Sequence, residues 1–357
     1  MKKKTIGTAY VGIDVHKNNW KVCLLGELGF RKEFSCEPES KVLFKSLIKL
    51  LPDFYFECAY EAGFSGFWLY DELNEMENVN CIIVNPADIP TSDKEKSQKE
   101  DRRDARKIAS QLKAGGLKGI YVPNSSDLGL REIQRTRFTV VKDLTRSKVR
   151  VKSFLMRHGI TPPKKLFPSS KSHWSARFIK WLKEIKLSSS TLRYSLDQLI
   201  AKVEFNRQMN LNVLKELRKQ LSNGAKSKQY EVLSEVRGLG TVGCSTIITE
   251  VVDIKRFSSY QQFHSYIGLI PSTNNSDTTE RIRGITNRSN KRLRSVFIEA
   301  AWIAIRYNEE LFHYYHELKR RMNANKAIIR VAKKIASQVR YLLLNLESEH
   351  SGIGQPA

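Results

Sequence analysis

The chain has 357 residues, of which 41% are hydrophobic, enough for folded cores rather than a disordered polymer. Its 61 lysines and arginines against 37 acidic residues give a formal net charge of +24, which predicts a polyanionic partner, nucleic acid before all others. No apolar run approaches the length that spans a membrane, and the Met-Lys-Lys-Lys start lacks the apolar stretch of a signal peptide.

The length predicts two domains with a helical connector. Five cysteines, an odd number without any Cys-x-x-Cys pair, indicate neither a zinc ribbon nor a disulfide framework. We therefore expect reduced, mainly buried thiols in a cytosolic protein.

The first third of the chain predicts a mixed sheet built around one carboxylate. Residues 10–17 read as a buried strand, and Asp14 interrupts its apolar run, where a charge is costly unless it is paired or binds a metal. The predicted elements that follow are strands Trp20–Leu25 and Phe30–Cys36 joined as a hairpin, helix Pro38–Leu51, strand Phe54–Tyr60, helix Phe67–Leu73, strand Cys81–Val84 and helix Arg102–Lys113. This α/β order is that of a ribonuclease-H-like sheet.

Four acidic residues stand at the ends of these elements. Asp14 lies in the first strand, and Glu61 ends the fourth strand. Asp101 and Asp104 open the last helix, three residues apart and therefore on one face. Carboxylates at strand ends together with a helical pair can hold two divalent cations for phosphodiester chemistry, and hard oxygen ligands favour Mg²⁺ or Mn²⁺.

Each acid also has a purely structural interpretation. Asp101 and Asp104 suit the positive end of the helix dipole, an effect of about 0.3–1 kcal/mol. Glu61 can be a surface residue at a strand end, with Glu57 as a competitor for its role. His16 shares a face with Asp14, which leaves open an approach to the site, but a packed or solvated histidine is the expectation.

The middle of the chain predicts long helices. A helix over Leu130–His158 carries a strong excess of basic residues, which favours phosphate contact over a merely solvated face. The residues expected to bind nucleic acid are Arg131, Arg135, Lys142, Arg146, Lys148 and Arg150. A proline-rich loop at Thr161–Ser172 precedes helices at Trp174–Ile185 and Ser189–Ser222, a pattern that suggests a coiled-coil hairpin and a dimerisation arm.

A Gly-rich turn marks the start of the last part. Helices predicted at Gln229–Val236 and Cys244–Val252 flank it, which is a helix-hairpin-helix-like arrangement. Gly238 and Gly240 let backbone amides approach a phosphate closely, beside the N-terminus of the second helix. The alternative is a plain connector.

A helix over Tyr260–Ile267 leads to Pro271–Gly284, which reads as an exposed, mobile polar loop, and then to an amphipathic helix over Asn290–Tyr307. Four arginines can contact DNA or stabilise charge at a reacting phosphate. They are Arg281, Arg283, Arg288 and Arg292. His313 and His316 have no full ligand set around them and are expected to pack rather than bind metal.

Several segments resemble one known family in sequence and in order. Tyr10–Lys17, Tyr60–Gly63 and Glu100–Ala109 resemble the DEDD, RuvC-like domain of the IS110 family of transposases. Further segments with the same resemblance are Arg237–Gly243, Tyr266–Ser272, Gly284–Arg294 and Glu299–Trp302. Together they extend over nearly the whole chain.

This resemblance implies a DNA recombinase of an insertion sequence, with a metal-binding RuvC-like domain and a serine nucleophile in the C-terminal domain. The family serine follows a Gly-Leu-x-Pro segment, so alignment from Pro271 selects Ser276, with Ser272 as second choice. Asn275 and Asp277 stand where the family has a serine and a glycine. Some family members use a structured guide RNA, and a homo-oligomer, dimer or tetramer, is expected in the bacterial cytoplasm, associated with the nucleoid when DNA is bound.

The expected organisation is α/β plus all-α. Residues 1–125 form the RuvC-like domain, residues 126–225 a long-helix connector, and residues 226–350 a mainly helical domain with the serine. Two other functions stay open on the residues alone: a metal-dependent junction endonuclease without a covalent intermediate, and a non-catalytic nucleic-acid-binding protein.

Overall fold

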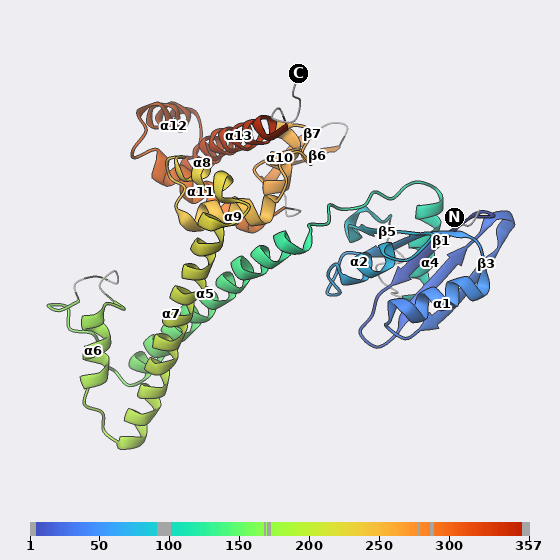
Figure 1. Cartoon of the computed structure of the whole chain (residues 1–357). Helices are drawn as coiled ribbons and strands as arrows, with labels where there is room; N and C mark the ends of the chain where they lie inside the picture. Colours follow the sequence, from blue (N-terminus) through green and yellow to red (C-terminus); the bar gives the residue numbers. More distant parts are fainter. Residues whose placement is uncertain are drawn as a thin grey trace. The chain divides into compact units, whose positions relative to one another are not determined.

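The computed structural model describes residues 5–90, 101–167, 169, 173–276, 279–285 and 289–351. At residues 28, 101–102, 271–276, 279–285 and 347–351 it describes the backbone alone. The chain separates into two compact units, residues 1–122 and residues 123–357 (Figure 1). The predicted division into three parts stays a prediction.

The first unit, which we call the sheet unit, contains a mixed five-stranded sheet in the order β3-β2-β1-β4-β5. Its strands are β1 (Thr8–Asp14), β2 (Trp20–Leu25), β3 (Arg31–Cys36), β4 (Tyr55–Glu61) and β5 (Val79–Val84). β2 is antiparallel to both of its neighbours, whereas β1, β4 and β5 run parallel. This sheet confirms the predicted hairpin and fits the ribonuclease-H-like α/β class.

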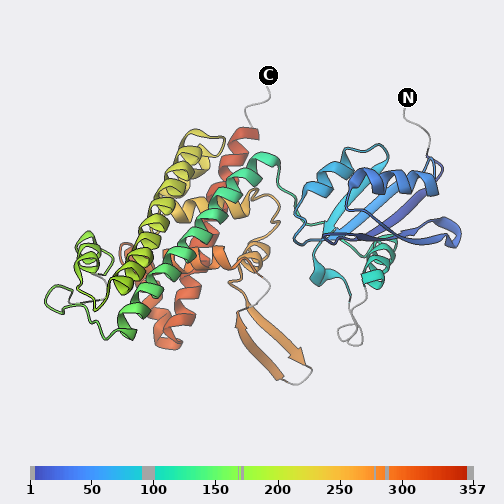
Figure 2. The ribbon, with the colours of Figure 1, turned by 90° about the horizontal axis from the view of Figure 1, so that it is seen from below.

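Helices cover both faces of the sheet (Figure 2). The helical elements are η1 (Glu27–Gly29), α1 (Ser40–Leu50), α2 (Trp68–Asn74), η2 (Pro86–Asp88) and α4 (Asp101–Lys113). Alternate strand residues such as Val11, Ile13 and Tyr60 join the core beneath α1 and α2. The opposite strand residues meet α4 through two small clusters, one of which joins Ala59 to Ile108.

Gly12 permits α4 to lie directly on β1. A Cβ atom at this position would stand 2.0 Å from the Ala105 carbonyl oxygen and 2.5 Å from the Ala109 nitrogen. Both are backbone atoms and cannot rotate away. Glycine is therefore the residue that this helix–strand contact requires.

The second unit, which we call the helical unit, begins with a long antiparallel pair of helices, α5 (Ser125–Arg157) and α7 (Ser190–Asn223), lying side by side (Figure 1). With α6 (Ala176–Glu184) between them in sequence, they form what we call the arm. A separate cluster that includes Phe154, Phe178 and Leu196 fills the far part of the arm. The helices confirm the predicted pattern, whereas a coiled-coil geometry is not established.

The remaining elements of the helical unit are α8 (Ser227–Ser234), α9 (Thr241–Val251), α10 (Tyr260–Ile267), β6 (Pro271–Ser276), β7 (Thr279–Ile285), α11 (Lys291–Ala304), α12 (Glu309–Arg321) and α13 (Ala324–Ser351). A single large apolar cluster unites the helices around α9. The rings of His316 and Phe312 lie 4.2 Å apart, but His313, His316 and Phe312 are all exposed, so neither histidine belongs to the core, contrary to the prediction.

The prediction of a polar loop over Pro271–Gly284 was wrong. The segment forms an antiparallel hairpin of β6 and β7. Both strands are mainly polar, so the hairpin lacks the apolar alternation that reveals a half-buried strand. The strand signal is limited to the β-branched residues Thr273, Thr279, Ile282 and Ile285.

All five cysteines are buried and free, as predicted. Burial raises the pKa of the Cys36 and Cys244 thiols to about 11, so these side chains are protonated and unreactive at neutral pH. Among the helices of the described residues, none is both long and apolar enough to cross a bilayer.

The contact at Gly12 generates a stability prediction. Gly12→Ala should lower the free energy of unfolding by about 1–3 kcal/mol, because the new methyl group overlaps backbone atoms of α4. Thermal unfolding of the full chain, followed by circular dichroism, measures the effect. Gly129→Ala is the control: this glycine lies within α5 with no other atom within 4 Å of an added Cβ, so the variant should match or slightly exceed the wild type. Equal stability of both variants would contradict the described packing of α4.

Candidate active site

Two carboxylates end neighbouring parallel strands of the sheet unit. In the pairing of β1 with β4, Ile13 lies opposite Tyr60. Asp14 and Glu61 are the next residues and the last of their strands. They therefore stand at the same edge of the sheet, on adjacent strands.

Both acids belong to the face that α4 covers. Asp14 lies two residues beyond Gly12, which contacts α4. Glu61 lies two residues beyond Ala59, which packs against Ile108 of α4. Strand side chains alternate between faces, so residues two apart share one.

The direction of α4 brings its first turn to the same edge. Ala105 lies over Gly12, and farther along the helix Lys113 Nζ donates to the Gly26 carbonyl at 2.9 Å. Gly26 follows β2, at the sheet edge where β1 begins. α4 is therefore antiparallel to β1, and its N-terminus points toward the edge that carries Asp14.

The predicted helical acids occupy this first turn. Asp101 lies four residues before Ala105, about 6 Å along the helix. Asp14 lies two residues past Gly12, about 7 Å along the strand in the same direction. Asp104 is half-buried, and the side chain of Asp101 lies outside the described residues. The backbone thus places the ends of β1 and β4, which carry Asp14 and Glu61, at the same edge and face of the sheet as the first turn of α4, which carries Asp101 and Asp104.

An ion pair ties α4 to the edge strand β3. Arg106 donates from Nε to Glu33 Oε1 at 2.8 Å and from Nη2 to Oε2 at 3.1 Å. The hydrogen bonds from Arg106, and then from Arg31, lower the pKa of Glu33 to about 2 despite its partial burial. Glu33 is thus a fixed negative charge. Through Arg106, which lies two residues after Asp104 on α4, it orients the helix about its axis.

His16 was expected to be packed or solvated, but its Nε2 atom lies 2.9 Å from Asp14 Oδ2. The Asp14 side chain is 20% exposed and that of His16 40%. The shared face in the sequence was the signal for this contact. Its consequence is that Asp14, the last residue of β1, is bound by a residue just beyond the end of the same strand.

The donor chemistry at this edge fits a hard divalent cation, because the converging groups are carboxylates. Within the described side chains, no group of three or more His, Cys, Asp or Glu residues is close enough to hold a metal ion. Asp14, Glu61 and Asp104 are among those side chains and do not form such a group, and the side chain of Asp101 lies outside them, so the metal site of four acids stays a prediction.

The predicted nucleophile lies in the helical unit, on the β6–β7 hairpin. Ser276 is the last residue of β6 and pairs with Thr279. Ser272, the second choice, pairs with Arg283 near the start of the strand, beside a register shift. Figure 2 shows the two strands extending away from the helices of this unit. The side chains of both serines lie outside the described residues.

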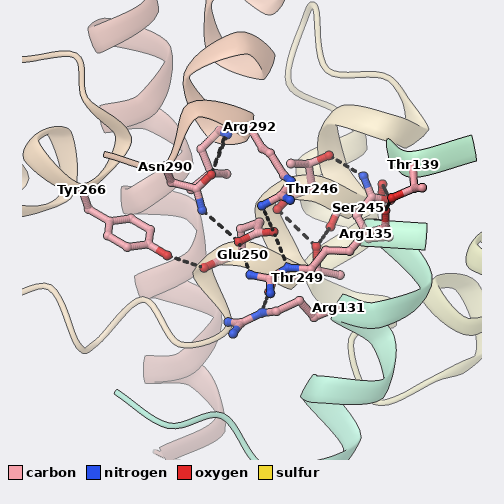
Figure 3. A network of polar contacts seen from close by, with 12 residues as sticks. Arg131, Arg135, Thr139, Ser245, Thr246, Thr249, Glu250, Tyr266, Asn290 and Arg292 are labelled. Atoms are coloured by element: carbon pink, nitrogen blue, oxygen red, sulfur yellow. Dashed lines mark hydrogen bonds and ion pairs between the residues drawn. The ribbon is translucent and has the colours of Figure 1, made fainter. Parts of the chain in front are cut away.

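The base of the hairpin rests on a buried polar network (Figure 3). The Asn290 backbone nitrogen donates to the Tyr266 carbonyl at 2.8 Å, which joins the two chain segments that enter and leave the hairpin. Beneath them lies Glu250 of α9, which is 2% exposed. Its carboxylate accepts from Asn290 Nδ2 at 2.9 Å, and its carbonyl accepts from the Tyr266 hydroxyl at 3.1 Å.

Arginines from α5 and α11 balance the charge of Glu250. Arg135 Nε and Nη2 each lie 3.3 Å from a carboxylate oxygen, and Arg292 Nη1 lies 3.7 Å away. Burial raises the pKa of Glu250, but the hydrogen bonds and charge of Arg135, the hydrogen bond from Asn290 and the charge of Arg131 outweigh it, so the pKa lies below its ordinary value. Glu250 is consequently ionised at neutral pH. Sequence reasoning missed this residue, although a lone charge inside the apolar run of α9 was the same signal that selected Asp14.

Comparison with known proteins finds two family matches along the chain. Residues 11–160 match the IS110-type DEDD transposase model, described as "Transposase", and residues 230–317 match the "Transposase IS116/IS110/IS902 family". The chain is 30% identical over 318 residues to the transposase for insertion sequence element IS1533 of Leptospira borgpetersenii, an alignment that covers 85% of this chain and 86% of that protein. The chain belongs to the IS110 family of insertion-sequence transposases.

Other relatives carry similar descriptions. A putative transposase of Sinorhizobium fredii is 29% identical over 303 residues, covering 82% of this chain and 71% of that protein. The transposase for insertion sequence element IS1111A of Coxiella burnetii is 22% identical, with 72% and 70% covered. The DEDD match contains all four predicted acids, and the second match contains Glu250 and Ser276.

The basic residues predicted on α5 of this transposase have different surroundings. Arg131 is buried and donates from Nε to the Thr249 carbonyl at 2.9 Å, and Arg135 is bound to Glu250. Lys148 Nζ lies 5.6 Å from the centre of the Trp174 ring. Residues 142, 146 and 150, all basic, are exposed.

The remaining predicted DNA contacts lie around the hairpin. The side chains of Arg281 and Arg283 and the whole of Arg288 lie outside the described residues, whereas Arg292 is exposed at the start of α11. Its guanidinium lies 5.4 Å from the centre of the Phe138 ring. Arg292 therefore presents a charge at the hairpin base that is only partly engaged by Glu250.

The two glycines before α9 differ in role. Gly238 has a φ of +94°, and an added Cβ would lie 2.3 Å from the Ala300 carbonyl oxygen, so packing against α11 requires glycine there. Gly240 is the N-cap of α9 and has open space around it. Only Gly240 has the room that the predicted phosphate contact needs.

The ion pair between Glu33 and Arg106 predicts a specific pH dependence. The pKa of Glu33 is about 2 in the folded chain, below its ordinary value of 4.5. The ionised carboxylate therefore stabilises the fold fully above pH 4.5, and this stabilisation is lost as the pH falls toward 2. Glu33→Gln should therefore be less stable than the wild type at pH 6, and the gap at pH 3 should be less than about half as large. Urea unfolding at both pH values measures the gap.

The matched control repeats Glu33→Gln in an Arg106→Ala background. There the substitution should have a smaller effect at pH 6, because the main partner of the carboxylate is absent. A gap of equal size at both pH values, or one that is independent of Arg106, would contradict the role given to this pair.

Proposed function

We propose that this transposase cuts and rejoins DNA by transesterification, with Ser276 as nucleophile and with Asp14, Glu61, Asp101 and Asp104 as ligands of Mg²⁺ or Mn²⁺. The observation that carries this proposal is the common edge and face shared by Asp14, Glu61 and the first turn of α4. A packed ribonuclease-H-like core has no structural need for acids to gather there.

In the proposed reaction the Ser276 hydroxyl oxygen attacks the scissile phosphorus and gives up its proton. The bond from phosphorus to the leaving deoxyribose oxygen breaks, and that oxygen takes up a proton. One phosphoester bond forms for each one broken, so a hydroxyl from another strand can reverse the step and rejoin the DNA. A bound divalent cation supplies Lewis acidity that favours charge at the reacting phosphate.

Arginines near the hairpin are suited to bind the negatively charged oxygens of the reacting phosphate. Arg292 is exposed at the hairpin base, and Arg281, Arg283 and Arg288 belong to the same stretch of sequence. Guanidinium groups bind phosphate oxygens through paired hydrogen bonds. We assign these residues to phosphate binding and charge stabilisation at the serine.

The arm is the proposed surface for nucleic acid. Basic residues such as Arg146 and Arg150 are exposed along α5 and outnumber its acidic residues, although Arg146 also pairs with Asp143 at 3.3 Å. We assign this surface to the DNA of the element ends and target, and to a structured guide RNA. From the resemblance to the family we further propose that the protein acts as a homo-oligomer, dimer or tetramer.

Trapping of a covalent protein–DNA adduct tests the nucleophile. Wild-type protein with Mg²⁺ and element-end DNA should give an adduct that survives denaturation, and Ser276→Ala should lower its formation by about a thousandfold or more. Ser272→Ala is the control and should keep the adduct. An adduct that persists in Ser276→Ala, or that is lost only in Ser272→Ala, would contradict the assignment.

Asp14→Asn in the same assay separates the rival functions. The recombinase proposal expects loss of both adduct and cleavage, with DNA affinity unchanged within about threefold. Cleavage by the wild type without any adduct would instead indicate an endonuclease that uses water. Binding without cleavage under all conditions would indicate a non-catalytic protein.

The role of the arm predicts a change in salt dependence. Replacing Arg146 and Arg150 together by alanine should weaken binding to duplex DNA and lower the slope of log K against log salt by about two, because each phosphate contact contributes roughly one. Fluorescence anisotropy at several salt concentrations measures the slope. Lys49→Ala, at an exposed lysine on α1, is the control and should leave it unchanged. An unchanged slope in the double variant would remove these two arginines from the interface.

A further inference from the structure

The two chain segments that enter and leave the β6–β7 hairpin are held against each other. We call Tyr266, Gly268, Ser289 and Asn290 the hairpin base. Gly268 ends α10 with a φ of +81°, and a Cβ atom there would lie 2.4 Å from Ser289 Cβ. Arg294 donates from Nη2 to the Ser289 hydroxyl, beside the backbone bond from Asn290 to Tyr266. The two segments consequently lie in close contact at Gly268 and Ser289.

Glu250 contacts both segments through different atoms. Its carboxylate accepts from the Asn290 side chain, on the outgoing segment, and its backbone carbonyl accepts from the Tyr266 hydroxyl, on the incoming segment. The carbonyl also accepts from Arg256 Nη2 at 3.2 Å. The Arg256 guanidinium in turn stacks on Tyr266, 4.6 Å from its ring centre. Both segments therefore take their position from one residue of α9.

The same carboxylate is bound to the arm. Arg135 comes from α5, and both of its contacting nitrogens reach Glu250. Next to it Arg131 bonds the Thr249 carbonyl, and Gln134 Nε2 donates to the Thr246 hydroxyl at 2.6 Å. Arm, α9 and hairpin base are thus joined by a continuous set of polar contacts, of which Figure 3 shows the part around Glu250.

A buried charge of this kind is a poor source of stability. Well-packed apolar side chains of similar volume stabilise a core as well as a buried ion pair or better, because the ions lose their hydration. What directed polar contacts supply instead is one defined geometry, since each group needs its own partner. Glu250 has partners on α5, on α10 and at the N-cap of α11, and the last two flank the hairpin.

We propose that Glu250 is a positioning residue for the hairpin that carries Ser276, fixing the direction of the hairpin relative to the arm. Its catalytic consequence rests on the proposed function, whereas the fixed hairpin base does not. Two substitutions break the contacts to Glu250 while leaving Glu250 itself in place.

The first substitution is Asn290→Asp. Asn290 is the N-cap of α11, and its side-chain oxygen accepts from the Arg292 and Leu293 nitrogens at 3.1 and 3.2 Å. Aspartate caps a helix equally well, so that function is kept. The donor to Glu250 is lost, and a second carboxylate is placed against the first. Asn308→Asp makes the same change at the N-cap of α12, where the side chain accepts from Leu311 at 2.9 Å, and serves as control.

The second substitution is Tyr266→Phe, which removes the hydroxyl donor and keeps the ring against Arg256. Tyr307→Phe, at a residue that is 69% exposed, is its control. Neither control residue contacts Glu250 in the part of the chain that the structure describes, so neither should change the hairpin.

The decisive measurement is amide hydrogen exchange of full-length protein over residues 271–285. We expect about tenfold faster exchange in Asn290→Asp and Tyr266→Phe, the factor for loss of one hydrogen bond at a charged or buried partner, and no change in the two controls. The proposal would be overturned if the hairpin amides of both test variants exchanged at the wild-type rate. It would also be overturned if the hairpin amides of the wild type already exchanged at the rate of unprotected amides.

Adduct formation gives the second readout. At saturating element-end DNA the rate should fall about tenfold in both test variants, while the affinity for DNA stays within about twofold. A general loss of folding would lower both together, and faster exchange without any fall in the rate would overturn the positioning role. If wild-type protein forms no adduct, the serine mechanism fails, and the exchange result alone decides whether Glu250 holds the hairpin.

Discussion

The direct contact between Gly12 and the backbone of α4 determines where the acids of the sheet unit stand. Because the strand presents no side chain at this position, the helix lies against it and its antiparallel course becomes fixed. Asp14 and the first turn of α4 then reach the same sheet edge from two directions. The ion pair between Arg106 of α4 and Glu33 of β3 fixes the rotation of the helix about its axis. One small residue thus decides the geometry of a site to which it contributes no chemical group.

The helical unit places its candidate nucleophile by a different kind of contact. In the described backbone the two strands of the hairpin pair with each other, and their sequence is mainly polar, so the hairpin offers little apolar surface for packing. Its orientation depends on hydrogen bonds at the base, and these converge on the ionised carboxylate of Glu250. A buried charge contributes little net stability, but each of its bonds requires one particular partner in one particular place. The IS110-family chain thus combines a site made by close packing with a site made by directed polar contacts.

The large positive charge of the chain has two separate uses. Some arginines are internal, as Arg131 and Arg135 are, and they join α5 to α9 by bonding a carbonyl and a carboxylate. Others, such as Arg146 and Arg150 farther along the same helix, are exposed. In the sequence all four belong to one basic run, and helical periodicity alone does not show which face meets a neighbouring helix. Their separation depends on the crossing of α5 with α9, a contact between residues more than a hundred positions apart.

The sequence by itself determined most of the local structure and the family. Alternating and helical apolar patterns placed the strands and helices, the lone charge in β1 selected Asp14, and an ordered set of motifs identified an IS110-family transposase. These features are local, because propensity and periodicity act over a few residues. Only the tertiary structure decided that Asp14 and Glu61 share one edge with the first turn of α4, that the stretch after Pro271 pairs as a hairpin, and that Glu250 anchors it. Strand order, hairpin pairing and buried ion pairs depend on which distant segments meet, and that choice is made by packing of the whole chain.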